Sequence, residues 1–289
     1  MHPAPSVIVF TVLSGLGFGY LALLGLGMPR VAGWGAFAAW GVGYGLAVAG
    51  LVASTFHLGQ PRRAPLAFTQ WRTSWLSREA WAATAALVWL APVALSDTFG
   101  LDWPRWWGWV GAAVCVSAVL ATGMIYAQIR AVPRWHSPVT PALFIGFAAT
   151  GGALLAGLSM APVLAAALAA LLALAWRHGD GALVRSGQDL GTATGLGPLG
   201  RVRVLEAPHT AGNYLLREMI FVVGRRHAAR LRAIAIGASA VLPAVLLVLM
   251  PGPWGQVPAI AAHLVGALAA RLLFFAEAEH VVGLYYGRR

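Results

Sequence analysis

The chain has 289 residues, of which 59% are hydrophobic and only 10% are charged, whereas soluble domains carry roughly 25% charged residues. This composition excludes an ordinary soluble domain and indicates an integral membrane protein. All 20 basic residues are arginine, so lysine-dependent phosphate-binding loops and pyridoxal Schiff bases are excluded.

Apolar segments of about 20 residues, the length that crosses a hydrocarbon core about 30 Å thick, recur along the chain. In chain order they predict spans at about 6–27, 34–56, 77–96, 106–129, 139–158, 160–176, 230–250 and 257–280. We expect the first to remain in the mature protein, because it lacks the basic start and cleavage pattern of a signal peptide. The expected fold is therefore all-α, a polytopic bundle of eight transmembrane helices that forms a single membrane domain over residues 1–289.

Glycines crowd the first two predicted spans, as S-G-L-G-F-G at 14–19 and G-V-G-Y-G at 41–45. Small residues let helix backbones approach closely inside a membrane. We therefore interpret these glycines as packing surfaces rather than as a ligand groove.

Arginine is distributed unequally between the two sides of the predicted bundle. With eight spans, 17 of the 20 arginines lie at the termini and in the loops after the second, fourth and sixth spans, and two lie on the opposite side. The positive-inside rule then places both termini and these loops in the cytoplasm, for a protein of the bacterial inner membrane. We therefore attribute the net charge of +11 to arginines in these cytoplasmic loops rather than to a nucleic-acid-binding surface.

The longest predicted loop, at about 177–229, lies on the same cytoplasmic side, and loops of this length are usually functional or disordered. Within it, alternating residues at 202–205 predict a short strand, and the segment 213–227 predicts an interfacial helix. We favour docking of a partner protein over plain disorder. The docking surface is expected to include Arg63, Arg201, Arg203, His209 and Tyr214.

The sequence predicts no metal or haem bound to this chain. Cys115 is the only cysteine, so the chain alone forms neither an intramolecular disulfide nor a four-thiolate iron–sulfur site. Only His263 among the eight histidines lies well inside a predicted span, and haem ligation between two imidazoles needs a second histidine at that depth. We expect His263 to be a hydrogen-bonded packing residue. The G-L-G-P-L-G run at 195–200 matches the dinucleotide-binding fingerprint only as text, because no strand–helix unit surrounds it.

The segment S-T-F-H-L-G-Q-P-R-R-A-P at 54–65 ends the second predicted span with polar residues. Interconversion of a quinone and a quinol moves two electrons and two protons, so its site needs hydrogen-bond partners and a group that titrates near neutrality. His57 supplies that group, and polar residues of the third, fourth and last spans are expected at the same depth. The predicted quinone site comprises His57, Gln60, Arg62, Arg72, Glu79, Tyr126, Arg271 and Glu277.

Two residues of this predicted site depend on helix positions. Glu79 is expected in the first turn of the third span, where an acid is favoured. Arg271 is expected roughly nine residues before the end of the last span, about 14 Å deep, and Glu277 and His280 are expected on one face of that span.

Other interpretations of these residues stay open. The basic loop after the second span could serve only to set topology, and Arg271 could extend to the interface or pair with a carboxylate to lock two helices. A transporter is a further alternative, since charges inside spans default to function. Against it, we find neither an inverted repeat nor broken helices near the membrane midplane.

Four sequence patterns occur together in this chain. They are H-L-G-Q-P-R-R-A at 57–64, S-R-E-A at 77–80, the stretch 124–135 followed by T-P at 140–141, and an Arg–aromatic–Glu–His pattern in the last span. Together they resemble the membrane anchor subunits of dimethyl sulfoxide reductase-type molybdoenzymes, the DmsC family. The resemblance implies a three-subunit oxidoreductase whose anchor exchanges electrons with the quinone pool, binds no haem, and uses His57 at the quinone site. Molybdopterin and iron–sulfur clusters would then reside in a catalytic subunit and a four-cluster ferredoxin-like subunit.

The arginine distribution favours a branch of this family whose catalytic subunits stay in the cytoplasm, because the H-L-G loop of the periplasm-facing reductases lies outside. The start M-H-P-A-P-S-V-I and the segment 206–219 resemble the anchor of the cytoplasm-facing sulfite dehydrogenase type. This resemblance implies electron flow from sulfite into ubiquinone or menaquinone. A quinol-oxidising anchor of a dimethyl sulfoxide, S-oxide or N-oxide reductase is the alternative.

Overall fold

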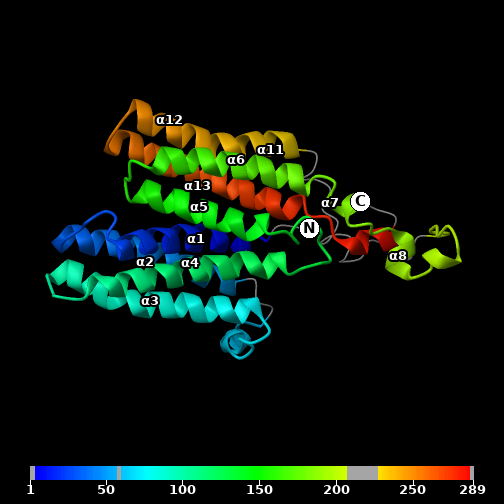
Figure 1. The fold of residues 1–289 in the computed structure, drawn as a ribbon, viewed down its shortest axis with the longest axis horizontal. Coiled ribbons are helices and arrows are strands. Elements are labelled where there is room, and N and C mark those ends of the chain that lie inside the picture. The colour runs from blue at the N-terminus through cyan, green and yellow to red at the C-terminus, as the bar shows by residue number, and fades with distance from the viewer. Residues whose placement is uncertain (1–3, 57–59, 207–226, 287–289) are drawn as a thin grey trace.

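The computed structural model of the protein describes residues 4–56, 60–206 and 227–286, and shows a bundle of long helices (Figure 1). The long helices are α1 (Pro5–Leu26), α2 (Gly33–Thr55), α3 (Trp75–Phe99), α4 (Arg105–Ala127), α5 (Val139–Leu155), α6 (Ala161–Gly179), α11 (Ala228–Ile236), α12 (Leu242–Leu249) and α13 (Pro253–Ala276). The short elements are η1 (Pro61–Phe68), α7 (Ala182–Arg185), α8 (Leu190–Thr194), η2 (Gly197–Leu199), η3 (Gly237–Val241) and η4 (Val281–Tyr286). No strand occurs in these ranges, so the strand predicted at 202–205 is wrong.

Seven helices in the described ranges are long and apolar enough to cross a membrane, which confirms an all-α membrane bundle. The seventh of the eight predicted spans is one continuous helical segment, Ala228–Leu249, formed by α11, η3 and α12. The fifth, predicted at 139–158, forms α5, which has only 17 residues and a length of about 25 Å. It ends before Gly157, which takes a left-handed φ of 63°. The count of eight is therefore not confirmed.

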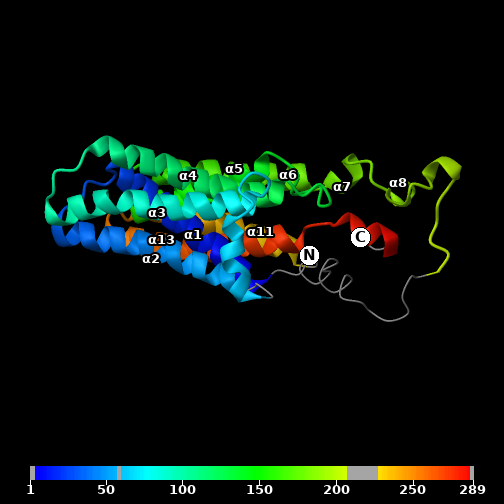
Figure 2. The same cartoon turned by 90° about the horizontal axis from the view of Figure 1, so that it is seen from below.

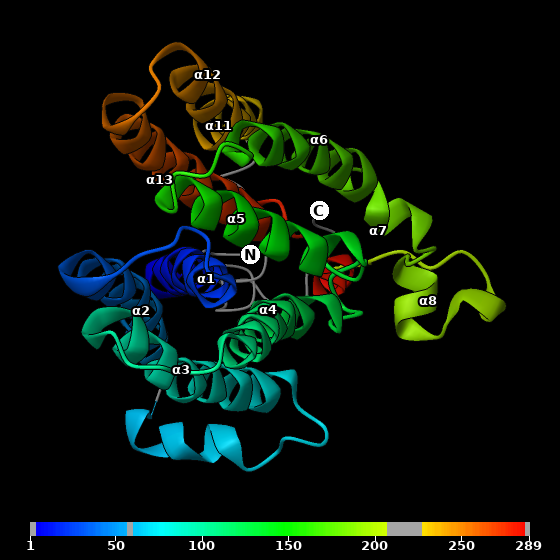
Figure 3. The same ribbon diagram turned by 60° about the vertical axis from the view of Figure 1, so that its left-hand side comes forward.

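Helix α1 lies at the centre of the bundle. It packs against α2, α4, α5 and α13, and Figure 3 shows it between α2–α4 on one side and α5, α6 and α11–α13 on the other. Its glycines permit this position. A methyl group at Gly17 would overlap the backbone of Ala47, and one at Gly19 would overlap the carbonyl of Ala148. The prediction that the glycines of 14–19 and 41–45 serve helix packing is confirmed for Gly17, Gly19 and Gly43, whereas a methyl group at Gly15, Gly41 or Gly45 would meet no atom within 4 Å.

One end of the bundle carries most of the described arginines, and we call it the basic end. Helices α1, α3, α5 and α11 begin there, α2, α4, α6 and α13 end there, and α7 and α8 extend beyond it (Figures 1 and 2). Arg30 and Arg105 lie in the sequence at the opposite turns, between α1 and α2 and at the start of α4. The functional residues discussed below lie toward the basic end.

Candidate functional site

A buried carboxylate joins α3 to α4. Glu79 is only 5% exposed, and its side chain accepts a hydrogen bond from the hydroxyl of Thr122. Helix α3 begins at Trp75 after the N-cap Ser74, two residues before the predicted start, so no acidic residue lies in its first turn. The predicted first-turn position of Glu79 is therefore wrong. The side chain faces the neighbouring helix rather than the helix terminus.

Tyr126 lies one turn after Thr122 on α4 and belongs to an aromatic cluster. Its ring centroid lies between 5.2 and 5.6 Å from those of Trp135, Phe144, Phe274 and Phe275. The ring of Phe144, which stacks on Tyr126, also lies against the guanidinium of Arg271, and Thr122, one turn earlier, donates a hydrogen bond to Glu79. The structure thus brings together three of the predicted site residues, which come from α3, α4 and α13.

Arg271 on α13 is 3% exposed. Its guanidinium carbon lies 3.5 Å from the ring centroid of Phe144 and 5.2 Å from that of Phe147. Within the described part of the chain it has no hydrogen-bond or ion-pair partner. Helix α13 ends at Ala276, so Arg271 lies about 8 Å from the helix end rather than at the predicted 14 Å. Burying a charge without an acceptor is costly, so this side chain is a candidate for ligand binding.

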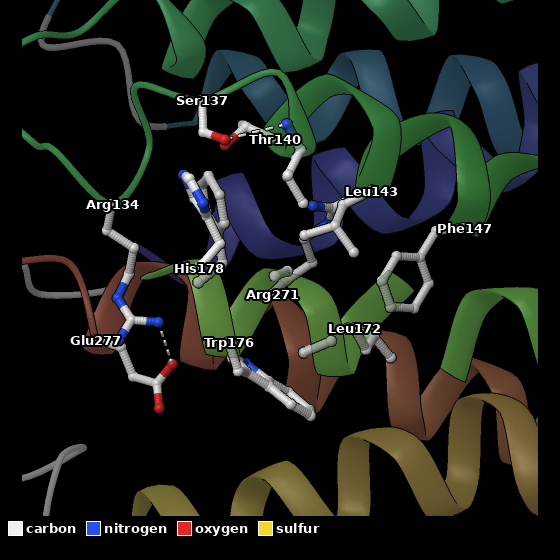
Figure 4. Close-up of a pocket in the computed structure, with 14 residues that line it drawn as sticks. Arg134, Ser137, Thr140, Leu143, Phe147, Leu172, Trp176, His178, Arg271 and Glu277 are labelled. Carbon is white, nitrogen blue, oxygen red and sulfur yellow. Dashed lines mark hydrogen bonds and ion pairs between the residues drawn. The ribbon is translucent and has the colours of Figure 1, made fainter. Parts of the chain in front are cut away.

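A small pocket opens beside Arg271, between α5, α6 and α13 (Figure 4). Its volume is about 50 Å³. The apolar part of the lining includes Leu143, Phe147, Leu172, Ala175, Trp176 and Phe274. The polar part comprises Arg134, Ser137, Thr140, His178, Arg271 and Glu277. The pocket therefore presents an aromatic and aliphatic wall to a few polar groups, the composition typical of small-molecule sites.

The sequence of this protein matches known proteins along its whole length. Residues 1–177 match the family described as DMSO reductase anchor subunit (DmsC). The chain belongs to the DmsC family. It is also similar to a sulfite dehydrogenase subunit from Allochromatium vinosum, with 33% identity over 99% of each chain. The resemblance inferred from the sequence is therefore confirmed.

Membership identifies the chain as a membrane anchor subunit of a molybdoenzyme oxidoreductase. An anchor of this kind implies a catalytic molybdoenzyme subunit and an iron–sulfur subunit as partners, and those partners hold the cofactors. Glu79 and Tyr126 of the DmsC-family anchor lie within the residues matched to the family, whereas Arg271 lies beyond them, inside the alignment with the sulfite dehydrogenase subunit.

Four charged side chains form a hydrogen-bonded network at the basic end of this DmsC-family anchor. Glu277 accepts hydrogen bonds from Arg134 Nη1 at 3.1 Å and from Arg232 Nε at 2.7 Å. Asp180 accepts from the same two arginines, at 2.5 Å from Arg134 and at 2.6 and 2.8 Å from Arg232. The hydrogen bond from Arg232 is the main reason why the pKa of Asp180 is lowered to about 2. A second cavity, of about 280 Å³, lies against this network.

The network lies where the last span ends, four residues earlier than predicted. Glu277 is the C-cap of α13, and the chain then turns so that the amide of Val281 donates to the carbonyl of Ala131 at 2.9 Å. Glu277 and His280 therefore do not share a helix face, and that expectation is wrong. The arginine partners lie far from Glu277 in sequence, so no local pattern indicated the pairing.

The remaining predicted residues of the DmsC-family anchor lie apart from the Arg271 pocket or outside the described ranges. Gln60, Arg62 and Arg72 are exposed, on a segment whose Phe68 packs edge-on against Trp81 of α3 at 5.3 Å. The docking residues Arg63, Arg201 and Arg203 are also exposed. His57, His209 and Tyr214 lie outside the described ranges. Most of the interfacial helix predicted at 213–227 lies outside them as well.

His263 is a packing residue in the interior of α13. It is 3% exposed, and its Nδ1 lies 2.7 Å from the carbonyl oxygen of Ser239 in η3. The prediction of a hydrogen-bonded packing histidine is confirmed. A group of three or more histidine, cysteine or acidic residues able to hold a metal ion is absent from the described residues.

Sequence reasoning missed four polar residues of the pocket. Arg134, Ser137, Thr140 and His178 lie in the connection between α4 and α5, at the start of α5 and at the end of α6. The sequence signal that could have indicated them is their position on one side of the membrane, where the fourth and sixth predicted spans end and the fifth begins. The sequence does not indicate which of these span ends contact α13.

Proposed function

We propose that this anchor transfers electrons between an iron–sulfur partner subunit and a membrane quinone, ubiquinone or menaquinone, whose ring binds against Arg271. The observation that carries the proposal is the buried guanidinium, which lines an apolar pocket and has no acceptor among the described residues. A quinone supplies what is missing, because each ring oxygen accepts hydrogen bonds while the ring itself packs on aromatic side chains.

Quinone binding requires the pocket to open. A cavity of roughly 150 Å³ is known to hold a benzene ring, whereas the pocket beside Arg271 measures about 50 Å³. The apolar wall of Phe147, Leu172 and Trp176 is therefore expected to move when a ring enters from the membrane.

The other predicted residues take supporting roles in this proposal. Tyr126 stacks on Phe144, the ring against which the Arg271 guanidinium lies, and Glu79 accepts a hydrogen bond from Thr122 one turn before Tyr126. Glu277 orients Arg134 at the edge of the pocket. The exceptions are residues of the α2–α3 connection, which the Arg271 pocket does not use: His57 stays a proton-exchange residue predicted from the sequence, and Gln60, Arg62 and Arg72 stay predicted quinone contacts.

We further propose that electrons flow from sulfite to quinone, because the similar protein is named as part of a sulfite dehydrogenase. A quinol-oxidising anchor of a dimethyl sulfoxide, S-oxide or N-oxide reductase is the alternative, and family membership argues against a transporter.

In this proposal α5 is an eighth span. By the positive-inside rule, the basic end faces the cytoplasm. The four-cluster iron–sulfur subunit docks at that end.

The proposal is tested with the purified three-subunit complex. Changing Arg271→Gln is expected to lower quinone-linked turnover by about 10- to 100-fold, since one charged hydrogen bond of roughly 1.5–3 kcal/mol to the substrate is lost. Turnover of the catalytic subunit with an artificial dye should persist. Arg105→Gln is the matched control, because this arginine pairs with Asp97 at the opposite end of the bundle. Equal quinone turnover in wild type and Arg271→Gln would contradict the proposed site. The direction of electron flow is decided by comparing two rates in the wild-type complex, sulfite-dependent quinone reduction and quinol-dependent S-oxide reduction.

A further inference from the structure

His178, the penultimate residue of α6, connects the Arg271 pocket to the surface at the basic end. The residue is exposed, yet its side chain also lines the pocket. Figure 4 shows its ring between Arg134 and Arg271, on the side of the pocket where Ser137 lies. Among the described residues, no side chain or backbone group forms a hydrogen bond with the ring nitrogens.

Quinone chemistry in this pocket needs protons as well as electrons. Reduction of the ring uses two electrons, which the iron–sulfur partner subunit supplies one at a time, and two protons, which convert both carbonyl oxygens to hydroxyls. The buried Arg271 can donate hydrogen bonds, but a guanidinium does not release its proton in proteins. The protons therefore come from water through some other residue of the pocket.

Few pocket residues can perform this task. Glu277 already accepts a hydrogen bond from an arginine on each carboxylate oxygen. The hydroxyls of Ser137 and Thr140 can pass a proton on, but they do not titrate near neutrality. Imidazole is the side chain that gains and loses protons at physiological pH, and His178 is the one histidine among the described residues that line this pocket.

We infer that His178 is the proton-exchange residue of the Arg271 pocket, an assignment that rests on the proposed quinone function. The protonated ring gives its proton, directly or through the hydroxyls of Ser137 and Thr140, to an oxygen of the reduced quinone. The neutral ring then takes a proton from water at the basic end. Two such transfers balance the two electrons, and quinol oxidation uses the same steps in reverse.

The charged groups around His178 come from several elements. Arg134, Arg271 and Glu277 face it across the pocket, and Arg185 of α7 donates a hydrogen bond to its backbone carbonyl. Asp180 follows two residues later, with a pKa lowered to about 2 by its hydrogen bond with Arg232, so this carboxylate does not change charge near neutrality. A pH effect on quinone turnover near neutrality that depends on position 178 is therefore assigned to the imidazole.

The test uses the intact three-subunit complex and a water-soluble short-chain quinone. His178→Ala is expected to slow quinone-linked turnover by about 10- to 100-fold, to leave dye-linked turnover unchanged, and to increase the solvent deuterium isotope effect. Added imidazole should restore turnover. His227→Ala is the matched control, because His227 is exposed at the same end of the bundle and does not line the pocket.

The outcomes separate this inference from the proposed function. Unchanged quinone turnover in His178→Ala across the pH range would overturn the role of His178 while leaving the quinone site intact. A loss that imidazole does not restore, with the isotope effect unchanged, would show a structural role and overturn it as well. If the wild-type complex turns over dye but no quinone, the proposed function fails and this inference fails with it.

Discussion

The guanidinium carbon of Arg271 lies 3.5 Å from the ring centroid of Phe144, inside a membrane-spanning helix bundle. A cation over an aromatic face is attracted to the ring, by about 2 kcal/mol where water is excluded. That attraction recovers only part of the cost of burying a charge. The arrangement therefore holds Arg271 in place while no described residue accepts a hydrogen bond from its donors, which leaves them available to a ligand from the bilayer.

Thr122→Val should destabilise the anchor through the contact between α3 and α4. Valine has nearly the same shape as threonine but cannot donate a hydrogen bond, so Glu79 would stay buried without its partner hydroxyl. The expected loss is about 1–3 kcal/mol in the free energy of unfolding, measured by thermal unfolding in detergent. Thr122→Ser keeps the donor and serves as the control. A loss in Thr122→Ser with none in Thr122→Val would show that the methyl group, not the hydrogen bond, matters.

Gly17→Ala should separate α1 from α2. The added methyl group would overlap the backbone of Ala47, and backbone atoms cannot move aside as a flexible side chain can. Overpacking of this kind costs about 1–3 kcal/mol, so a lower thermal unfolding temperature is expected in the detergent-solubilised anchor. Gly15→Ala is a close control, because a methyl group there meets no atom within 4 Å. If both variants unfold at the same temperature, the packing argument is wrong.

The stability of the basic end should fall at acid pH. Hydrogen bonding with Arg232 lowers the pKa of Asp180 from 3.8 to about 2. A depressed pKa contributes stability above the unfolded value and loses it as pH falls through the folded value, so the loss is expected between about pH 4 and pH 2. Because Asp180 is half-exposed, the effect should be modest. Unfolding temperatures measured across this range should show a weaker pH dependence in Asp180→Asn. An unchanged pH dependence would mean that other carboxylates dominate.

Much of this architecture follows from local patterns that can be read without a structure. Apolar runs long enough to cross a bilayer mark the helices, because no water in the membrane core can satisfy a free backbone. The glycines of the first span, Gly17 among them, indicate close packing for the same local reason. Glu79, Tyr126 and Arg271 could also be chosen in advance, since polar groups near or inside apolar runs are costly and so default to function.

Only the tertiary structure decided which polar groups meet. The pairing of Glu277 with Arg134 and Arg232 brings together the end of α13, the α4–α5 connection and α11, which are distant in sequence. The same arrangement brings His178 beside Arg271. The physical reason is that hydrophobicity sets how deep a helix lies but not which helices are its neighbours, and a binding pocket depends on those neighbours.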